Sequence, residues 1–90
     1  MMNSRQLKTA TKARWKKTGA GRLALMAEHI MDEPELAAQV IRIRHMKWKV
    51  VLWSWGSNDP EPVRFDGDWA RYSTAKKAKA AAEQAFLQTL

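Results

Sequence analysis

The segment MKWKVVLWSWGSNDPEPVRFDGDWARY, residues 46–72, contains four of the five tryptophans of this 90-residue chain and its only tyrosine. From residue 47 its large apolar side chains recur at alternate positions, which is the spacing of a β-strand. One face of this strand would carry Trp48, Val50 and Leu52. The opposite face would carry Val51, Trp53 and Trp55. The pattern predicts a central strand that helices cover on one face and that is partly covered on the other.

The rest of this segment predicts two further strands. Residues 56–62 are rich in Gly, Ser, Asn, Asp and Pro, which is typical of a loop. Residues 63–65 form a short second strand, and Asp66-Gly67 is a strong signal for a two-residue hairpin. Residues 69–72 then return as a third strand. The segment therefore predicts a three-stranded antiparallel meander.

Helices are predicted on both sides of this meander. Residues 5–17 form a first helix with a thin apolar stripe, and residues 22–31 form a second. The second is indicated by Leu23, Met26, Ala27 and Ile30, which recur at i, i+3, i+4 and i+7. Pro34 suits the first position of a third helix, which continues to about residue 44.

A last helix over residues 75–88 follows a capping Ser73 or Thr74. Its alanine-rich face would pack closely on the sheet. The predicted fold class is α+β, with N-terminal helices, a three-stranded antiparallel meander and a C-terminal helix packed on the sheet.

The net charge of +7 is concentrated at the start of the chain. Residues 1–22 contain no acid, and their cations alone equal the whole excess of positive charge. These cations are Arg5, Lys8, Lys12, Arg14, Lys16, Lys17 and Arg22. The run at 18–21, Thr-Gly-Ala-Gly, reads as a hinge. We therefore predict a basic N-terminal arm over residues 1–21, helical or partly disordered, and a single α+β domain over residues 22–90.

A basic arm of this kind is typical of proteins that bind a polyanion. Its cations would neutralise phosphates, although a solvated arm is an equally simple interpretation. Lys76, Lys77 and Lys79 crowd the start of the last helix, where free backbone N–H groups attract anions. These lysines therefore predict a second phosphate contact, with a solvated lysine face as the alternative.

The run Ser-Thr-Ala-Lys-Lys-Ala-Lys-Ala-Ala-Ala over residues 73–82 is similar to the last helix of double-stranded RNA-binding domains. That resemblance implies an αβββα order over residues 34–90 and phosphate contacts by the lysines at the start of the helix. The family's Gly-Pro and His loop has no counterpart in residues 56–62, which are acidic instead.

The tryptophans raise a separate question, because a domain of this size can hardly cover both faces of its sheet. Trp53 and Trp55 are the candidates for exposure, where they would stack on single-stranded bases or form a hot spot for a protein partner. The alternative is that the first helices cover that face.

Several classes of function are excluded or unsupported. Without cysteine there is no disulfide, thiolate zinc site or cysteine nucleophile, which fits a reducing, cytoplasmic interior. No apolar run reaches the roughly 18 residues that a membrane span needs. The two histidines, His29 and His45, have no partners at metal-ligand spacing, so we expect no metal, no cofactor and no enzyme activity.

The sequence therefore predicts a small non-enzymatic nucleic-acid-binding protein that contacts mainly phosphates, with DNA or RNA left open. The alternative is a protein-binding adaptor or inhibitor, such as a small phage-type protein acting on a host nucleic-acid machine. It would use the Trp-rich sheet as its interface.

Overall fold

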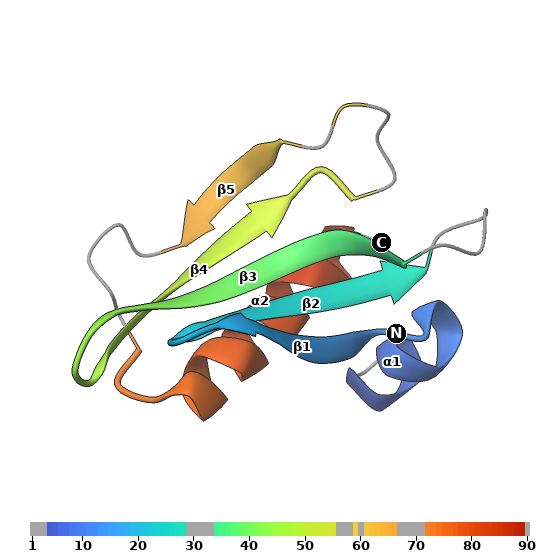
Figure 1. The fold of residues 1–90 in the computed structure, drawn as a ribbon. Coiled ribbons are helices and arrows are strands. Elements are labelled where there is room, and N and C mark those ends of the chain that lie inside the picture. Colours follow the sequence, from blue (N-terminus) through green and yellow to red (C-terminus); the bar gives the residue numbers. More distant parts are fainter. Residues whose placement is uncertain (1–3, 29–33, 56–58, 60, 67–71, 90) are drawn as a thin grey trace.

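Five strands form one antiparallel sheet in chain order in the computed structural model of the protein (Figure 1). The strands are β1 (Arg14–Gly19), β2 (Arg22–Glu28), β3 (Pro34–Arg44), β4 (Lys47–Trp53) and β5 (Pro62–Asp66). A helix precedes the sheet, α1 (Ser4–Thr11), and a longer one follows it, α2 (Ala75–Thr89). The structure describes residues 4–28, 34–55, 59, 61–66 and 72–89.

The predicted N-terminal helices and three-stranded meander are wrong. The segments predicted as the second and third helices are strands β2 and β3, which pair with each other along most of their length. Of the first predicted helix only α1 is helical, and its second half is strand β1. Of the return strand predicted over residues 69–72, only Tyr72 is described, and it forms an isolated antiparallel bridge with Trp48. Residues 69–71 and the turn residue Gly67 lie outside the described residues.

The helical interpretation failed because β2 and β3 satisfy two periodicities at once. Leu23, Leu25 and Ala27 alternate along β2 and pack in or against the core, which is the period of a strand. In β3 the run from residue 41 to 44 alternates isoleucines with arginines after the β-branched Val40, a composition that favours strands over helices. Thr18-Gly19-Ala20-Gly21, predicted as a hinge, instead leads through the tight turn between β1 and β2.

The predicted central strand and last helix are confirmed as β4 and α2. Ala78 and Ala82 are fully buried, and Phe86 is almost so. The small side chains of the two alanines let α2 lie close to β3 and β4, which it crosses on one face of the sheet (Figure 1). Trp48, Val50 and Leu52 belong to the core on that face, as their alternation predicted.

The connections place three chain segments at one end of the sheet. The β1–β2 turn and the β3–β4 turn lie at this end because each strand pair is antiparallel and ordered in chain sequence. The start of α2 joins them, since Trp48 N–H donates to the Tyr72 carbonyl at 2.8 Å, three residues before the helix. At the opposite end lie α1, the end of β2 and the start of β3 (Figure 1).

The helix α1 ends in a left-handed residue. Lys12 has φ of 51°, and Ala13 N–H donates to the Lys8 carbonyl at 3.1 Å. This arrangement is a Schellman-type helix end, in which a late N–H satisfies a carbonyl of the last turn. After this helix end the chain passes through the buried Ala13, and β1 begins at the next residue, Arg14.

Among the described residues, no helix is both long and apolar enough to span a membrane.

The β1–β2 turn depends on Gly21. Its φ is +67°, and a Cβ added there would lie 3.0 Å from the Cβ of Arg42, whose N–H donates to the Gly21 carbonyl. Gly21→Ala should lower the free energy of unfolding by about 1–2 kcal/mol, because a left-handed residue with a side chain is strained. Urea denaturation measures this change.

Gly19→Ala is the matched control, because its Cβ would meet only the Cδ of Arg22 at 3.9 Å and its φ is not left-handed. Its free energy of unfolding should change by less than about 1 kcal/mol. Equal losses for the two variants would contradict the role given to Gly21.

Candidate nucleic-acid interface

Cations from five elements gather at the end of the sheet that carries both turns. We call this cluster the basic end; it consists of Lys17, Arg22, Arg42, Arg44, Lys47, Lys76 and Lys77. All of these side chains are exposed except Lys47, which is half-buried. None of them forms an ion pair with a residue that the structure describes.

Most of the described acids lie away from the basic end, whereas Asp66 ends β5 opposite Val50, at the middle of β4. Glu28 and Glu35 flank the β2–β3 connection, and Asp59 and Glu61 lie between β4 and β5, at the end opposite the basic end. Glu83 lies in the middle of α2, where it is buried and paired. The described charges are therefore unevenly distributed along the strands, with cations at the basic end and Glu28, Glu35, Asp59 and Glu61 at the opposite end.

The structure divides the cations of the predicted arm between the two ends. Arg5, Lys8 and Lys12 belong to α1 and its exit, away from the basic end, whereas Lys17 and Arg22 belong to the basic end. Arg14 and Lys16 are exposed on the intervening part of β1. Because β1 pairs with β2, residues 14–19 are part of the sheet, and the boundary predicted after residue 21 falls inside a hairpin.

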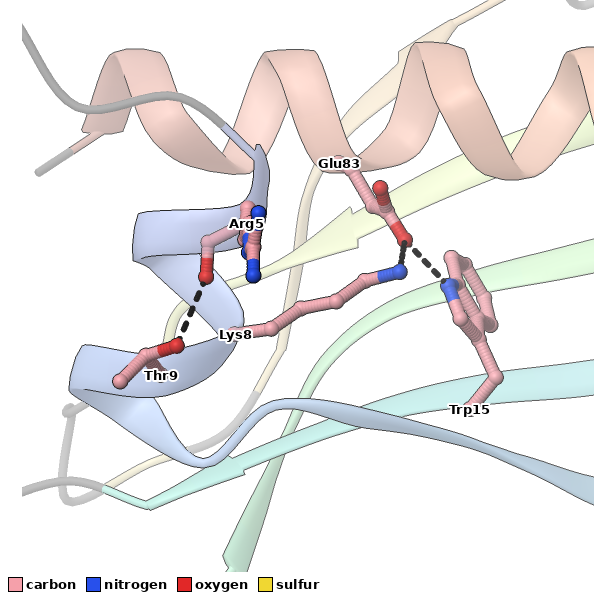
Figure 2. A network of polar contacts seen from close by, with 5 residues as sticks. All are labelled: Arg5, Lys8, Thr9, Trp15 and Glu83. Carbon is pink, nitrogen blue, oxygen red and sulfur yellow. Dashed lines mark hydrogen bonds and ion pairs between the residues drawn. The ribbon is translucent and has the colours of Figure 1, made fainter.

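Two of the predicted phosphate-binding lysines are already paired with acids. Lys8 Nζ lies 3.0 Å from Glu83 Oε1, and the Glu83 side chain is only 10% exposed (Figure 2). Lys12 Nζ lies 3.5 Å from Glu28 Oε2 at a more exposed position. A cation that already neutralises a protein carboxylate interacts less favourably with a phosphate, so these two lysines would be poorer phosphate ligands than the cations of the basic end.

Glu83 also anchors the only tryptophan outside the Trp-rich segment. The Trp15 indole N–H donates to the same Oε1 at 2.8 Å, and the residues are 68 positions apart in the chain (Figure 2). Lys79 Nζ lies 5.9 Å from the centroid of the Trp15 ring, within the range of a cation–π contact. Trp15 therefore packs β1 against α2, and the Lys79 ammonium group interacts with the Trp15 ring.

The start of α2 is capped by Thr74, one of the two predicted caps. Thr74 Oγ1 accepts a hydrogen bond from Lys77 N–H at 3.2 Å, and the Thr74 carbonyl accepts one from Ala78 N–H at 3.1 Å. The cap therefore occupies backbone donors that an anion would use. What the helix start contributes is mainly the charge of the exposed Lys76 and Lys77 side chains.

The predicted tryptophan pair is split between the two faces of the sheet. Trp53 is half-buried on the face away from α2, where its indole N–H donates to Gln39 Oε1 at 2.9 Å. Trp55 turns into the core: its ring meets Phe86 edge-to-face at 5.0 Å and its N–H donates to the Ala27 carbonyl at 2.9 Å. Of the pair, only Trp53 therefore lies on the face away from α2, and Trp69 lies outside the described residues.

Sequence reasoning missed three members of the basic end, Arg42, Arg44 and Lys47. Their charges are balanced along the chain by nearby acids, but folding carries Glu28, Glu35, Asp59 and Glu61 to the opposite end of the sheet. The signal was present in Arg42-Ile43-Arg44-His45-Met46-Lys47, where cations surround a short turn between alternating apolar residues. That pattern is typical of an exposed β-hairpin tip.

Two hollows mark the surface. One of about 200 Å³ lies in the basic end, lined by Lys17, Gly19, Gly21, Arg22, Leu23, Arg42 and Trp48. The other, of about 510 Å³, lies near the start of β1, lined by Lys12, Arg14, Trp15, Lys16, Met26, Glu28 and Pro34. The described residues contain no group of His, Asp and Glu side chains that could hold a metal ion.

No protein-family model, curated protein or solved structure matches this chain. The resemblance to double-stranded RNA-binding domains implied a helix over residues 34–44. That segment is strand β3, so the described fold does not have the αβββα order. The lysine-rich helix α2 is the part of that resemblance that the fold retains.

Glu83→Ala should lower the free energy of unfolding by about 1–3 kcal/mol, because it leaves the part-buried Trp15 N–H without its acceptor. Glu83→Gln should cost less, since an amide oxygen can still accept from Trp15 although it does not pair with Lys8. Thermal and urea denaturation measure both changes. Glu61→Ala is the control, because that side chain is exposed, and it should change stability by less than about 0.5 kcal/mol. Equal stability of Glu83→Ala and Glu61→Ala would contradict the anchoring role.

Proposed function

We propose that this protein binds nucleic acid through its basic end, mainly by contacts to backbone phosphates. The observation that supports the proposal is the gathering of cations from β1, β2, β3, β4 and α2 at one end, where none of them pairs with a described acid, while Glu28, Glu35, Asp59 and Glu61 lie at the other end. A nucleic acid is the polyanion that such a surface suits, because each phosphate it neutralises releases condensed counterions.

The rigidity of these cations favours the proposal. Arg22, Arg42 and Lys47 project from paired strands, and the Arg42 N–H donates to the Gly21 carbonyl at 2.7 Å. Side chains on a fixed backbone lose less conformational freedom on binding than those of a disordered arm. The basic end is therefore a better phosphate surface than the free arm that the sequence suggested.

The surface favours backbone contacts over sequence reading. Base readout in the major groove usually uses Arg, Asn or Gln side chains on an inserted helix or ribbon. The exposed face at the start of α2 carries Lys76, Lys77 and Ala80, which offer charge but no bidentate pattern. We therefore expect broad tolerance of sequence.

Removing charge from the basic end should reduce both affinity and its dependence on salt. Arg42→Gln with Lys77→Gln removes two phosphate contacts, so the slope of log K against log salt should become shallower by about 1.8 on duplex DNA. Fluorescence anisotropy of a labelled duplex at several salt concentrations measures that slope.

Arg5→Gln with Lys12→Gln is the matched control, because it removes the same charge from the α1 end. It should change the slope by less than half as much. Equal effects of the two pairs would show that only net charge matters. If neither duplex nor single-stranded nucleic acid binds at low salt, the proposed function is wrong, and the protein-binding adaptor becomes the better hypothesis.

A further inference from the structure

The β3–β4 hairpin has an apolar tip set among the cations of the basic end. Ile43 is 51% exposed and Met46 is 57% exposed. Only Val63, in β5, is a comparably exposed large apolar side chain among the residues that the structure describes. Two of these three side chains therefore lie within four residues of chain at one hairpin tip.

The tip extends beyond the neighbouring hairpin. The last contact of β3 with the β1–β2 hairpin is at Arg42, whose N–H donates to the Gly21 carbonyl. Residues 43–46 lie past that contact, and every side chain from Arg42 to Met46 is exposed. Figure 1 shows this turn as the most extended point of the sheet at that end. The two apolar side chains can therefore reach a partner before the rest of the sheet does.

The backbone of the tip is also unusual. Met46 has φ of 56°, in the left-handed region that favours Gly, Asn or Asp. Methionine is not one of the residue types that a tight turn prefers at this position, and its apolar side chain is exposed to solvent. Neither the left-handed backbone of Met46 nor the exposure of its side chain stabilises the fold. Both features are expected of a side chain that a partner buries.

Cations flank this apolar tip at its base. Arg44 pairs with Lys47 across the hairpin, and Trp48 is bridged to Tyr72, which leads the chain to Lys76 and Lys77. An apolar point ringed by cations fits the minor groove of duplex DNA. There Ile and Met side chains enter between base pairs while Arg and Lys contact the phosphates on either side.

We propose that the β3–β4 hairpin inserts Ile43 and Met46 into the minor groove of duplex DNA and bends the duplex. The inference rests on the proposed function and adds to it the duplex form, the groove and the deformation. Partial unstacking at the inserted step is offset by the extra contacts that the bent duplex makes with the basic end. A-form RNA has a wide, shallow minor groove, so wedging is not expected there.

The test uses Ile43→Ser with Met46→Ser in the full chain. On a short DNA duplex with a donor and an acceptor dye at its ends, the natural protein should raise energy transfer as the ends approach. The double variant should lose that rise and bind DNA at least about tenfold more weakly, while its slope of log K against log salt stays unchanged. On duplex RNA the two proteins should bind equally.

Val63→Ser is the matched control, since Val63 is equally exposed but lies in β5. It should bend and bind DNA like the natural protein, and urea denaturation should show that all variants are folded. DNA binding without a rise in energy transfer, or an equal rise with the double variant, overturns the wedge and leaves the proposed function intact. Failure to bind any nucleic acid at low salt overturns both.

A membrane partner is the remaining outcome for an apolar and cationic tip. Binding to vesicles of phosphatidylcholine with phosphatidylserine tests this outcome, and it is measured by the change in tryptophan fluorescence emission. Vesicle binding that depends on Ile43 and Met46, without DNA bending, would overturn the wedge in favour of a lipid surface.

Discussion

A single buried carboxylate joins the two ends of this chain. Glu83 Oε1 receives both the Trp15 indole N–H and the Lys8 ammonium, so one oxygen ties α1 and β1 to the last helix (Figure 2). Strand β1 is at the edge of the sheet and pairs only with β2. Without this anchor it would be held by one ladder of hydrogen bonds and by the packing of the half-buried Trp15 ring. The position of Lys17 and of the β1–β2 turn therefore depends on a contact at the middle of α2.

The alanines of α2 impose the other constraint on the architecture. Because Ala78, Ala82 and Ala85 are buried, the helix lies close to β3 and β4, and large side chains must fill the space around it. Trp48, Trp55 and Phe86 do so. This explains why the tryptophans were a misleading guide to function. Most of the described indoles pack against the core or donate to a protein acceptor, as Trp15, Trp53 and Trp55 do.

The sequence predicted correctly those elements whose hydrophobic periodicity fits only one type of secondary structure. Strand β4 and helix α2 have one dominant period each, and both were predicted within a few residues of their ends. In β2 the residues Leu23, Met26 and Ala27 fit a helix while Leu23, Leu25 and Ala27 fit a strand, and local propensity could not decide between them. Pairing between strands decided it. The same long-range pairing created the basic end, because the position of Arg42 beside Gly21 is a property of sheet register.

The separation of charge between the two ends of the strands disfavours folding. Cations gathered at one end repel each other, so the basic end is a cost to folding that neighbouring acids could have relieved. Four of the described acids, Glu28, Glu35, Asp59 and Glu61, instead lie at the other end of the strands, where Glu28 pairs with Lys12 from the exit of α1. Repulsion within the basic end is retained while the cations at the other end are partly neutralised. A fold selected for stability alone would have no reason to leave the charges so arranged, whereas a polyanion bound at the basic end removes the repulsion. Under the proposed function, the free energy of binding would include relief of the charge repulsion that the free protein carries.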